Sequence, residues 1–117
     1  MRFDHHKLDV YAAALDFVVL VDPLLEDLPP GRGYLALQLR KAAASIVSNV
    51  AEGAGEFAPK EKRRFYRIAR RSGTECAAQL DMLLRLELIG AADHEGTIRL
   101  LHRIVSMLVQ MSKPRHA

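Results

Sequence analysis

Apolar residues recur at every third or fourth position along most of the chain, which is the repeat of helices that bury one face. The pattern predicts four helices, at about residues 8–28, 34–52, 59–89 and 93–112. Prolines and glycines, which end helices or tighten turns, separate these segments. The boundary residues are Pro29, Pro30, Gly31 and Gly33 after the first helix, Gly53 and Gly55 after the second, Pro59 in the first turn of the third, and Gly90 and Asp93 as caps around the last connection.

Short connections between long helices favour antiparallel neighbours. The expected fold is therefore all-α, an antiparallel up-down-up-down four-helix bundle in a single domain of residues 1–117. The composition agrees, because half of the 117 residues are hydrophobic while seven are aromatic and none is tryptophan. A core of Leu, Val, Ile and Ala suits helices. Pro23 lies inside the first segment, where it predicts a kink or a short break.

Beside the apolar face of the second helix runs a line of polar residues, and the third helix repeats the arrangement. These positions recur at helical intervals and are Gln38, Ser45, Asn49 and Glu52, then Ser72, Glu75 and Gln79. A surface helix needs no such line, so we expect the two helices to face each other through polar groups that set helix register and the subunit contact. Arg40 can join them through Glu75, between helices or between subunits. Leucine at Asn49 or Glu75 should therefore disturb assembly.

Several of these segments also resemble a known family. The resembling stretches are Gln38-Leu39-Arg40-Lys41-Ala42-Ala43, Ser45-Ile46, Asn49-Val50-Ala51-Glu52-Gly53, Phe65-Tyr66-Arg67-Ile68-Ala69-Arg70, and Ser72 with Glu75. They are similar to the bacterial four-helix-bundle proteins, or 23S rRNA-intervening sequence proteins, from about Leu8 to Met111. The resemblance implies a four-helix bundle and a closed, commonly pentameric ring, and it implies no catalytic activity. The family usually has glycine then serine where this chain has Arg71 and Ser72 before Gly73, which leaves close helix packing there open.

The first helix gives the argument for assembly from the residues themselves. One apolar stripe consists of Val10, Ala14, Phe17, Val21, Leu24 and Leu28, and a second consists of Leu8, Tyr11, Leu15 and Val18. A bundle buries one side of each helix, so a helix that is apolar around most of its circumference needs a second partner. We expect self-association to supply it. The alternative is that the tail after Met111 covers the second stripe.

Charge is strongly segregated along the chain. Residues 1–31 carry two basic and six acidic side chains, whereas residues 32–71 carry ten basic and three acidic ones. One face of the third helix is predicted to carry the basic residues Lys60, Arg63, Arg64, Arg67, Arg70 and Arg71. Such a row can follow a phosphate backbone of RNA or DNA with salt-sensitive affinity. It can equally be a solvated face, or pair with the acidic first helix of a neighbouring subunit. Phe65 is expected in the core, with Tyr66 and Tyr34 as candidates for base stacking.

The chemistry of an enzyme is not indicated. No Glu-x-x-His pair for a di-iron site and no glycine-rich phosphate loop are present. His5 and His6 are adjacent at a terminus expected to be frayed, and His94, His102 and His116 have no partners at ligand spacing. The single cysteine, Cys76, is interpreted as a buried structural thiol. We therefore expect no catalytic residue, cofactor or metal site.

The leading interpretation is a noncatalytic, cytoplasmic homo-oligomer, a pentamer if the resemblance holds. The expectation of a cytoplasmic protein without a membrane partner rests on the absence of a secretory signal and of an apolar run long enough to span a bilayer. The alternative is a nucleic-acid-binding accessory factor. Some relatives assist reverse transcriptases, so a reverse transcriptase is a possible protein partner in that case.

Overall fold

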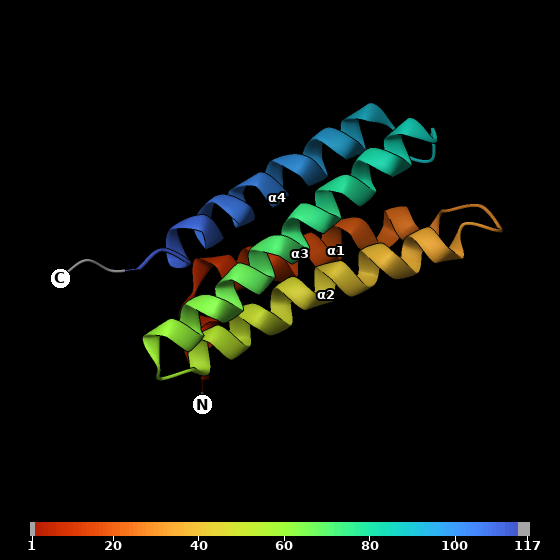
Figure 1. The fold of residues 1–117 in the computed structure, drawn as a ribbon. Helices are drawn as coiled ribbons and strands as arrows, with labels where there is room; N and C mark the ends of the chain where they lie inside the picture. The colour runs from red at the N-terminus through yellow and green to blue at the C-terminus, as the bar shows by residue number, and fades with distance from the viewer. Residues whose placement is uncertain (1, 115–117) are drawn as a thin grey trace.

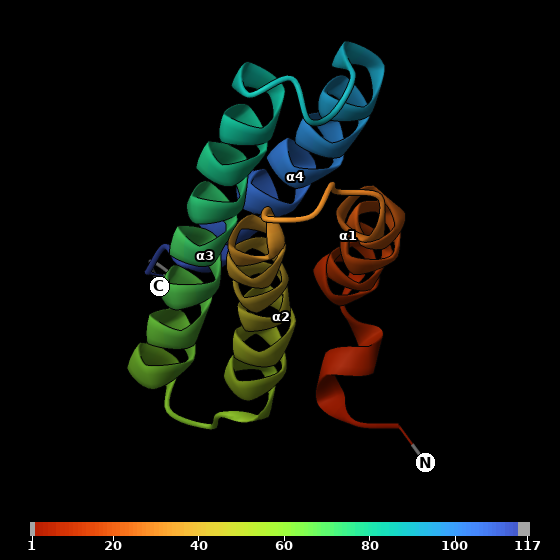
Figure 2. The ribbon, with the colours of Figure 1, turned by 90° about the vertical axis from the view of Figure 1, so that its right-hand side faces the viewer.

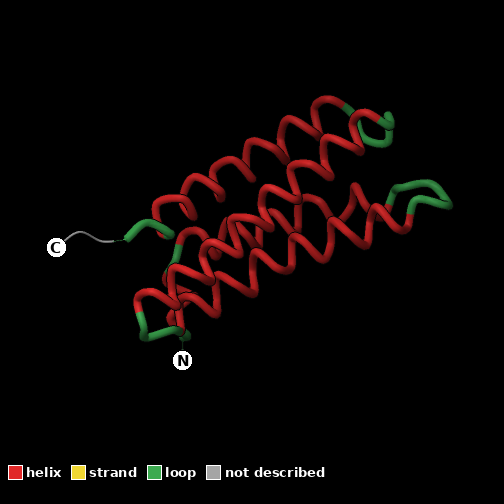
Figure 3. Tube along the Cα trace, in the orientation of Figure 1, coloured by secondary structure: helices red, strands yellow, loops and turns green. Residues whose placement is uncertain are grey.

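The computed structural model describes residues 2–114 and has an all-α fold, with four long helices and no strand among these residues. Figure 3 shows the helices joined by short loops. The elements in chain order are the 3₁₀ helix η1 (Asp4–Lys7), α1 (Asp9–Glu26), α2 (Gly33–Gly55), α3 (Pro59–Arg85) and α4 (Ala91–Met111).

Each long helix packs against two others. α2 packs most extensively on α3, α3 also packs on α4, and α1 packs on both α2 and α4 (Figures 1 and 2). The α1–α2 and α3–α4 connections lie at one end of the molecule and the α2–α3 connection lies at the other (Figure 1). α2 and α3 run in opposite directions, because Gly53 lies beside Tyr66 whereas Ser45 meets Ser72.

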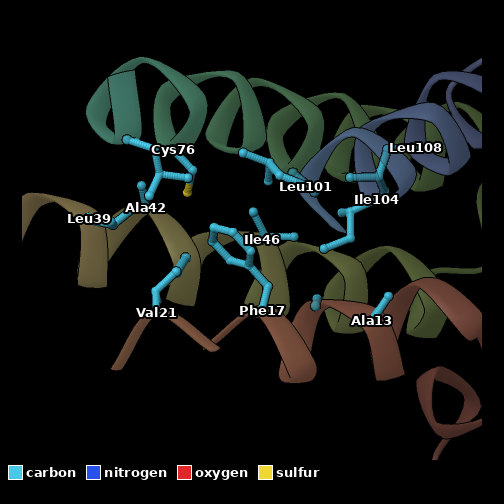
Figure 4. Packing of buried hydrophobic residues seen from close by; sticks show 14 of the residues in the cluster. Ala13, Phe17, Val21, Leu39, Ala42, Ile46, Cys76, Leu101, Ile104 and Leu108 are labelled. Atoms are coloured by element: carbon cyan, nitrogen blue, oxygen red, sulfur yellow. The ribbon is translucent and has the colours of Figure 1, made fainter. Parts of the chain in front are cut away.

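All four helices contribute to one aliphatic core. Phe17 of α1 is fully buried and reaches into the space between the helices near Ile46 of α2 (Figure 4). Leu80 and Leu83 of α3 are buried in the same core. The other large side chains with almost no exposed surface are Val10, Leu39, Val50, Leu101, Ile104 and Leu108. Buried leucine, isoleucine and valine side chains each contribute about 1.5–3 kcal/mol, so this cluster is the main source of stability.

Two helices end differently from the prediction. α2 continues through Gly53 to Gly55, and neither glycine adopts the left-handed conformation expected of a cap. α3 ends at Arg85 and not at Ile89, because Glu87 takes the left-handed position (φ 59°) that closes a helix. The N–H of Leu88 then donates to the carbonyl oxygen of Leu83 at 2.9 Å, which satisfies a free carbonyl at the helix end.

The first and last helices show smaller differences. α1 runs through the exposed Pro23 to Glu26 without a break. α4 begins at Ala91 after Gly90, so Asp93 lies in its first turn and does not precede it. The N-terminal residues from Asp4 are not frayed but form η1, in which the N–H of Phe3 donates to Nδ1 of His6 at 3.0 Å.

Gly73 lies where α3 and α4 approach each other closely. A Cβ atom at this position would lie 2.8 Å from Cγ2 of Val105. Carbon atoms in ordinary contact are about 3.5–4.0 Å apart, so a larger side chain would push the helices apart. Close packing is therefore present although the glycine is displaced from its usual position in the resembling family.

We expect Gly73→Ala to lower the free energy of unfolding by up to about 2 kcal/mol. Overpacking costs about 1–3 kcal/mol, and the better helix propensity of alanine recovers about 1 kcal/mol. Chemical denaturation monitored by circular dichroism measures the change. Gly96→Ala in α4 is the matched control, because nothing lies within 4 Å of its Cβ position, and it should raise stability by about 0.5–1 kcal/mol. Equal gains in both variants would contradict the proposed close contact.

Candidate functional site

Three of the predicted polar residues meet between α2 and α3. The hydroxyl oxygens of Ser45 and Ser72 lie 2.8 Å apart, which is a hydrogen bond between the two helices. Nδ2 of Asn49 donates to the carbonyl oxygen of Ser45 at 2.8 Å and to its Oγ at 3.1 Å. Ser72 is buried and the other two are half-buried. These short side chains fix the register of α2 against α3 while letting the backbones approach closely.

Gln79 and Glu75 form a second, looser part of the predicted set. Nε2 of Gln79 lies 3.5 Å from Oε1 of Glu75, one turn away on α3. Gln79 is buried, and its Oε1 has no hydrogen-bond partner among residues 2–114. Gln38 and Glu52 of α2 are exposed. Of these seven polar residues, only Ser45 and Ser72 are bonded between the two helices within residues 2–114, and Asn49 bonds to Ser45 on its own helix.

Arg40 lies on the other flank of α2 and pairs with α1. It forms a salt bridge with Asp22, and its Nη2 lies 2.8 Å from Oε1 of Glu26. The hydrogen bond with Asp22 raises the pKa of Arg40. A pair between Arg40 and Glu75 within one chain is therefore not formed. The sequence analysis did not identify Asp22 and Glu26 as the partners of Arg40. Their spacing of four residues puts both carboxylates on one exposed helix face, which is the pattern that indicates a shared partner.

The predicted basic residues lie on α3, and most have no acidic partner. Arg64 pairs with Glu61 at 2.6 Å, and the hydrogen bond lowers the pKa of Glu61. The remaining residues make no salt bridge within residues 2–114 and are Lys60, Arg63, Arg67, Arg70 and Arg71. α3 therefore carries five cationic groups without an acidic partner in the described part of the chain. We call these five residues the basic stripe.

Of the two adjacent aromatic residues beside the basic stripe, Tyr66 lies in the core and Phe65 does not, contrary to the prediction. Tyr66 is only 5% exposed, so it belongs to the core and offers no face for stacking. A Cβ on Gly53 would lie 2.6 Å from Cε1 of Tyr66, so the glycine makes room for this ring. Phe65 is half-buried, and the guanidinium of Arg64 lies 4.6 Å from the centre of its ring. Tyr34 remains 53% exposed, so it is the accessible one of the two proposed stacking residues.

Lys62 has a structural role at the end of α2. Its Nζ donates to the carbonyl oxygens of Gly53 and Ala54 at 2.7 and 3.0 Å. The carbonyl of Gly53 also accepts the N–H of Glu56 at 3.3 Å, just beyond the helix. The cation beside these two carbonyls also opposes the negative end of the helix dipole. The third helix thus caps the second through Lys62, in place of the predicted glycine cap.

Cys76 is fully buried in the core, as predicted. Burial is the main reason that the pKa of its thiol is raised to about 12, and the nearby Glu75 carboxylate adds to the effect. The thiolate is the nucleophilic form of cysteine, so a thiol in this environment is poorly suited to covalent chemistry.

The histidines do not converge on a metal site in the described part of the chain. No group of three or more potential ligands of the His, Cys, Asp or Glu type lies together among residues 2–114. His5 and His6 of η1 pack against the ring of Tyr11, and His94 pairs with Asp81 across α3 and α4 at 2.8 Å. His116 lies outside the described residues. None of the helices in residues 2–114 is long and apolar enough to cross a membrane.

The Ser45–Ser72 bond can be tested by a double-mutant cycle. We expect Ser45→Ala and Ser72→Ala to be coupled by about 0.5–1.5 kcal/mol in the free energy of unfolding, because each variant removes the same hydrogen bond. Ser48→Ala is the control, since Ser48 of α2 bonds only to Ala44 of its own helix. With Ser72→Ala it should be additive within about 0.5 kcal/mol. Additivity in both cycles would contradict a bond between the helices.

Comparison with known proteins gives the family. The profile of the 23S rRNA-intervening sequence protein family matches residues 6–110. A search of curated proteins gives no significant match. A solved structure of a protein of unknown function, from the S23 ribosomal protein family of Bacteroides thetaiotaomicron VPI-5482, is similar with a TM-score of 0.82. The sequence identity is 21%, and the match covers 90% of this chain and 99% of that one, which shows a shared fold. Because the profile spans nearly the whole chain, the protein belongs to the 23S rRNA-intervening sequence protein family.

Proposed function

We propose that this protein is a noncatalytic, cytoplasmic four-helix bundle of up-down-up-down order that assembles into a closed homo-oligomeric ring. The observation that carries the proposal is an exposed apolar surface on α1. Leu15, Val18 and Val19 are 41%, 37% and 72% exposed, and the half-buried Leu8 and Tyr11 extend the same side of the helix. We call these five residues the outer stripe.

The outer stripe is separate from the side of α1 that builds the core. Ala13, Phe17 and Val21 point into the bundle (Figure 4), and they are almost completely buried. Within residues 2–114 no element covers Leu15, Val18 and Val19, and the part of the proposed covering tail from residue 115 lies outside the described residues. A contiguous apolar surface on a helix is typical of a protein contact. The partner that we propose for the outer stripe is another copy of the same chain, because such a copy is present wherever the protein is.

The bundle order and the ring have different support. The order is supported by connections that lie at alternating ends of the molecule (Figure 1) and by α2 and α3 running in opposite directions. The ring is supported by the outer stripe, and the pentamer number only by the family resemblance. The polar groups that the fold brings together, Ser45, Asn49 and Ser72, bond to one another, which is a structural role.

The solution mass tests the ring. Light scattering coupled to size exclusion should give a mass near five times the 13.1 kDa of the chain. Leucine replacements at Asn49 and Glu75 should lower the assembled fraction, because both residues lie along the α2–α3 side that we assign to the subunit contact. Leu20→Gln, on α1 but outside the outer stripe, is the control and should leave the mass unchanged. A monomeric mass of the unaltered chain at high concentration would overturn the proposal.

A second candidate function is backbone binding to RNA or DNA by an accessory factor, with a reverse transcriptase as its protein partner. The basic stripe favours it, because its five cations have no acidic partner within residues 2–114. Their spacing of three or four residues puts Arg63, Arg67 and Arg70 in one row on α3. Phosphate contacts of this kind carry no sequence information, and several copies in a ring would add their affinities.

Salt dependence distinguishes this candidate from a purely structural ring. With a mixed-sequence RNA, log Kd should rise steeply with log salt concentration, and the double variant Arg63→Gln with Arg67→Gln should lower that slope by about 0.7 for each phosphate that it no longer neutralises. The control removes the same charge from exposed positions on α4, by Arg99→Gln with Arg103→Gln. Fluorescence anisotropy measures both. Two results would argue against the basic stripe as a nucleic-acid surface. One is no RNA binding at low salt, and the other is an equal loss of RNA affinity in the α3 and α4 double variants.

A further inference from the structure

The connection between α2 and α3 presents an aromatic ring to solvent. Phe57 lies in this connection and is 94% exposed, the highest fraction among the large apolar side chains of residues 2–114. The connection forms one tip of the elongated bundle, away from the α1–α2 and α3–α4 connections (Figure 1). The ring therefore adds nothing to the core and is accessible to an external partner.

The backbone around Phe57 is held by hydrogen bonds. Oε1 of Glu56 accepts the N–H of Phe57 at 3.0 Å and the N–H of Ala58 at 3.3 Å. On the other side, the N–H of Glu56 donates to the carbonyl oxygen of Gly53 at 3.3 Å, and Pro59 begins α3. A ring on a backbone that is already ordered loses less conformational entropy on binding than a ring on a loose loop.

The basic stripe starts next to this ring. Lys60, its first member, follows Phe57 by three residues and is exposed. From Lys60 to Arg71 the stripe extends about 16 Å along α3, at about 1.5 Å per residue. An aromatic group and a line of cations therefore follow one another from the tip of the bundle along the first half of α3.

The carboxylates near this path are engaged or face elsewhere. Glu61 is the acidic residue between Pro59 and Arg71, and it pairs with Arg64. Glu56 is occupied by the two N–H groups of the connection. Glu52 and Asp4 line a hollow between η1 and the end of α2. The path from the ring along α3 is thus positively charged.

We propose that Phe57 stacks on an unpaired base of a single-stranded RNA or DNA whose phosphates follow the basic stripe. The inference rests on the second candidate function and specifies its ligand as a single strand. Aromatic side chains stack on any base, because every base has a π-face. In a duplex the base faces are covered by neighbouring base pairs, whereas in a single strand they can be splayed out onto an aromatic ring. Phe57 takes the stacking role that the sequence analysis gave to Tyr66 and Tyr34. Tyr66 is buried, and Tyr34 lies in the first turn of α2, at the other end of the bundle.

The direction of the basic stripe favours a strand over a lipid surface. Binding to a membrane scales with the apolar area that enters it and with cations at the level of the headgroups. Here one ring projects at the tip, and the cations run away from the tip along the axis of α3. A line of charge that leads away from a single ring matches a backbone of phosphates that ends in a stacked base.

The experiment compares single-stranded with double-stranded RNA. Fluorescence anisotropy at low salt measures the Kd of a mixed-sequence RNA of about 12 nucleotides, alone and paired with its complement. Phe57→Ala should raise the Kd of the single strand by about 5- to 150-fold, which corresponds to the loss of one stacked base, and leave the Kd of the duplex unchanged. The slope of log Kd against log salt concentration should stay the same, because the substitution removes no charge.

Three further variants test that the effect is stacking. Phe57→Tyr keeps an aromatic ring and should bind the single strand like the unaltered chain. Phe57→Leu keeps apolar bulk without a π-face and should bind as weakly as Phe57→Ala. Phe3→Ala removes another exposed ring, on the far side of the hollow beside η1, and should leave both Kd values unchanged. Phe57 makes no core contact, so all variants at this position should fold, and circular dichroism melting curves check it.

The outcomes separate this inference from the candidate function on which it rests. No binding of either RNA by the unaltered chain at low salt would overturn both. Salt-sensitive RNA binding that Phe57→Ala leaves unchanged would keep the basic stripe as a nucleic-acid surface and overturn the stacking role, as would full affinity in Phe57→Leu. Loss of binding to phosphatidylserine vesicles in Phe57→Ala, with RNA affinity unchanged, would instead assign the connection to a lipid surface.

Discussion

The close approach of α2 to α3 is the contact on which the rest of the structure depends. Small or short side chains line it, from Gly53 under the ring of Tyr66 to the hydroxyl pair of Ser45 and Ser72. Lys62 joins the same two helices by capping the carbonyls at the end of α2. Hydrogen bonds of this kind require defined positions, whereas aliphatic packing tolerates small shifts. The register of the bundle is therefore set at this pair, and α1 and α4 pack onto an arrangement already fixed.

Two sides of α1 have different roles, one in the core and one at the surface of the bundle. Its core side supplies Phe17 and Val21, and its outer stripe remains apolar and exposed. Arg40 ties the C-terminal part of α1 to α2 through Asp22 and Glu26, so acidic residues take the place of apolar ones along that side of the helix. Exposed ion pairs contribute little stability, typically below about 1 kcal/mol. Their arrangement instead limits the apolar surface to residues 8–19, which gives a contact there a defined extent.

Much of this fold could be predicted from the sequence because it follows from periodicity, and for the same reason Ser45 and Ser72 could be placed among the polar residues through which α2 and α3 face each other. The remaining features depend on geometry that no local pattern contains. The partner of Arg40 depends on which flank of α2 faces α1. Whether Phe65 or Tyr66 lies in the core depends on how α3 is turned about its own axis. The ring of Tyr66 fills the space that Gly53 leaves by having no side chain. The end of α3 depends on Glu87 adopting a left-handed conformation that glycine usually takes, so residue type alone pointed to Gly90.

The basic stripe connects the two proposed functions. Its members Arg67 and Arg71 are exposed and Arg63 and Arg70 are half-buried, and none of them makes a salt bridge within residues 2–114. Acidic residues of a neighbouring copy and the phosphates of a nucleic acid would neutralise the same cations, so the two contacts compete for them. A ring would bring the basic stripes of several copies together, and the weak phosphate contacts of each copy would add along a single strand.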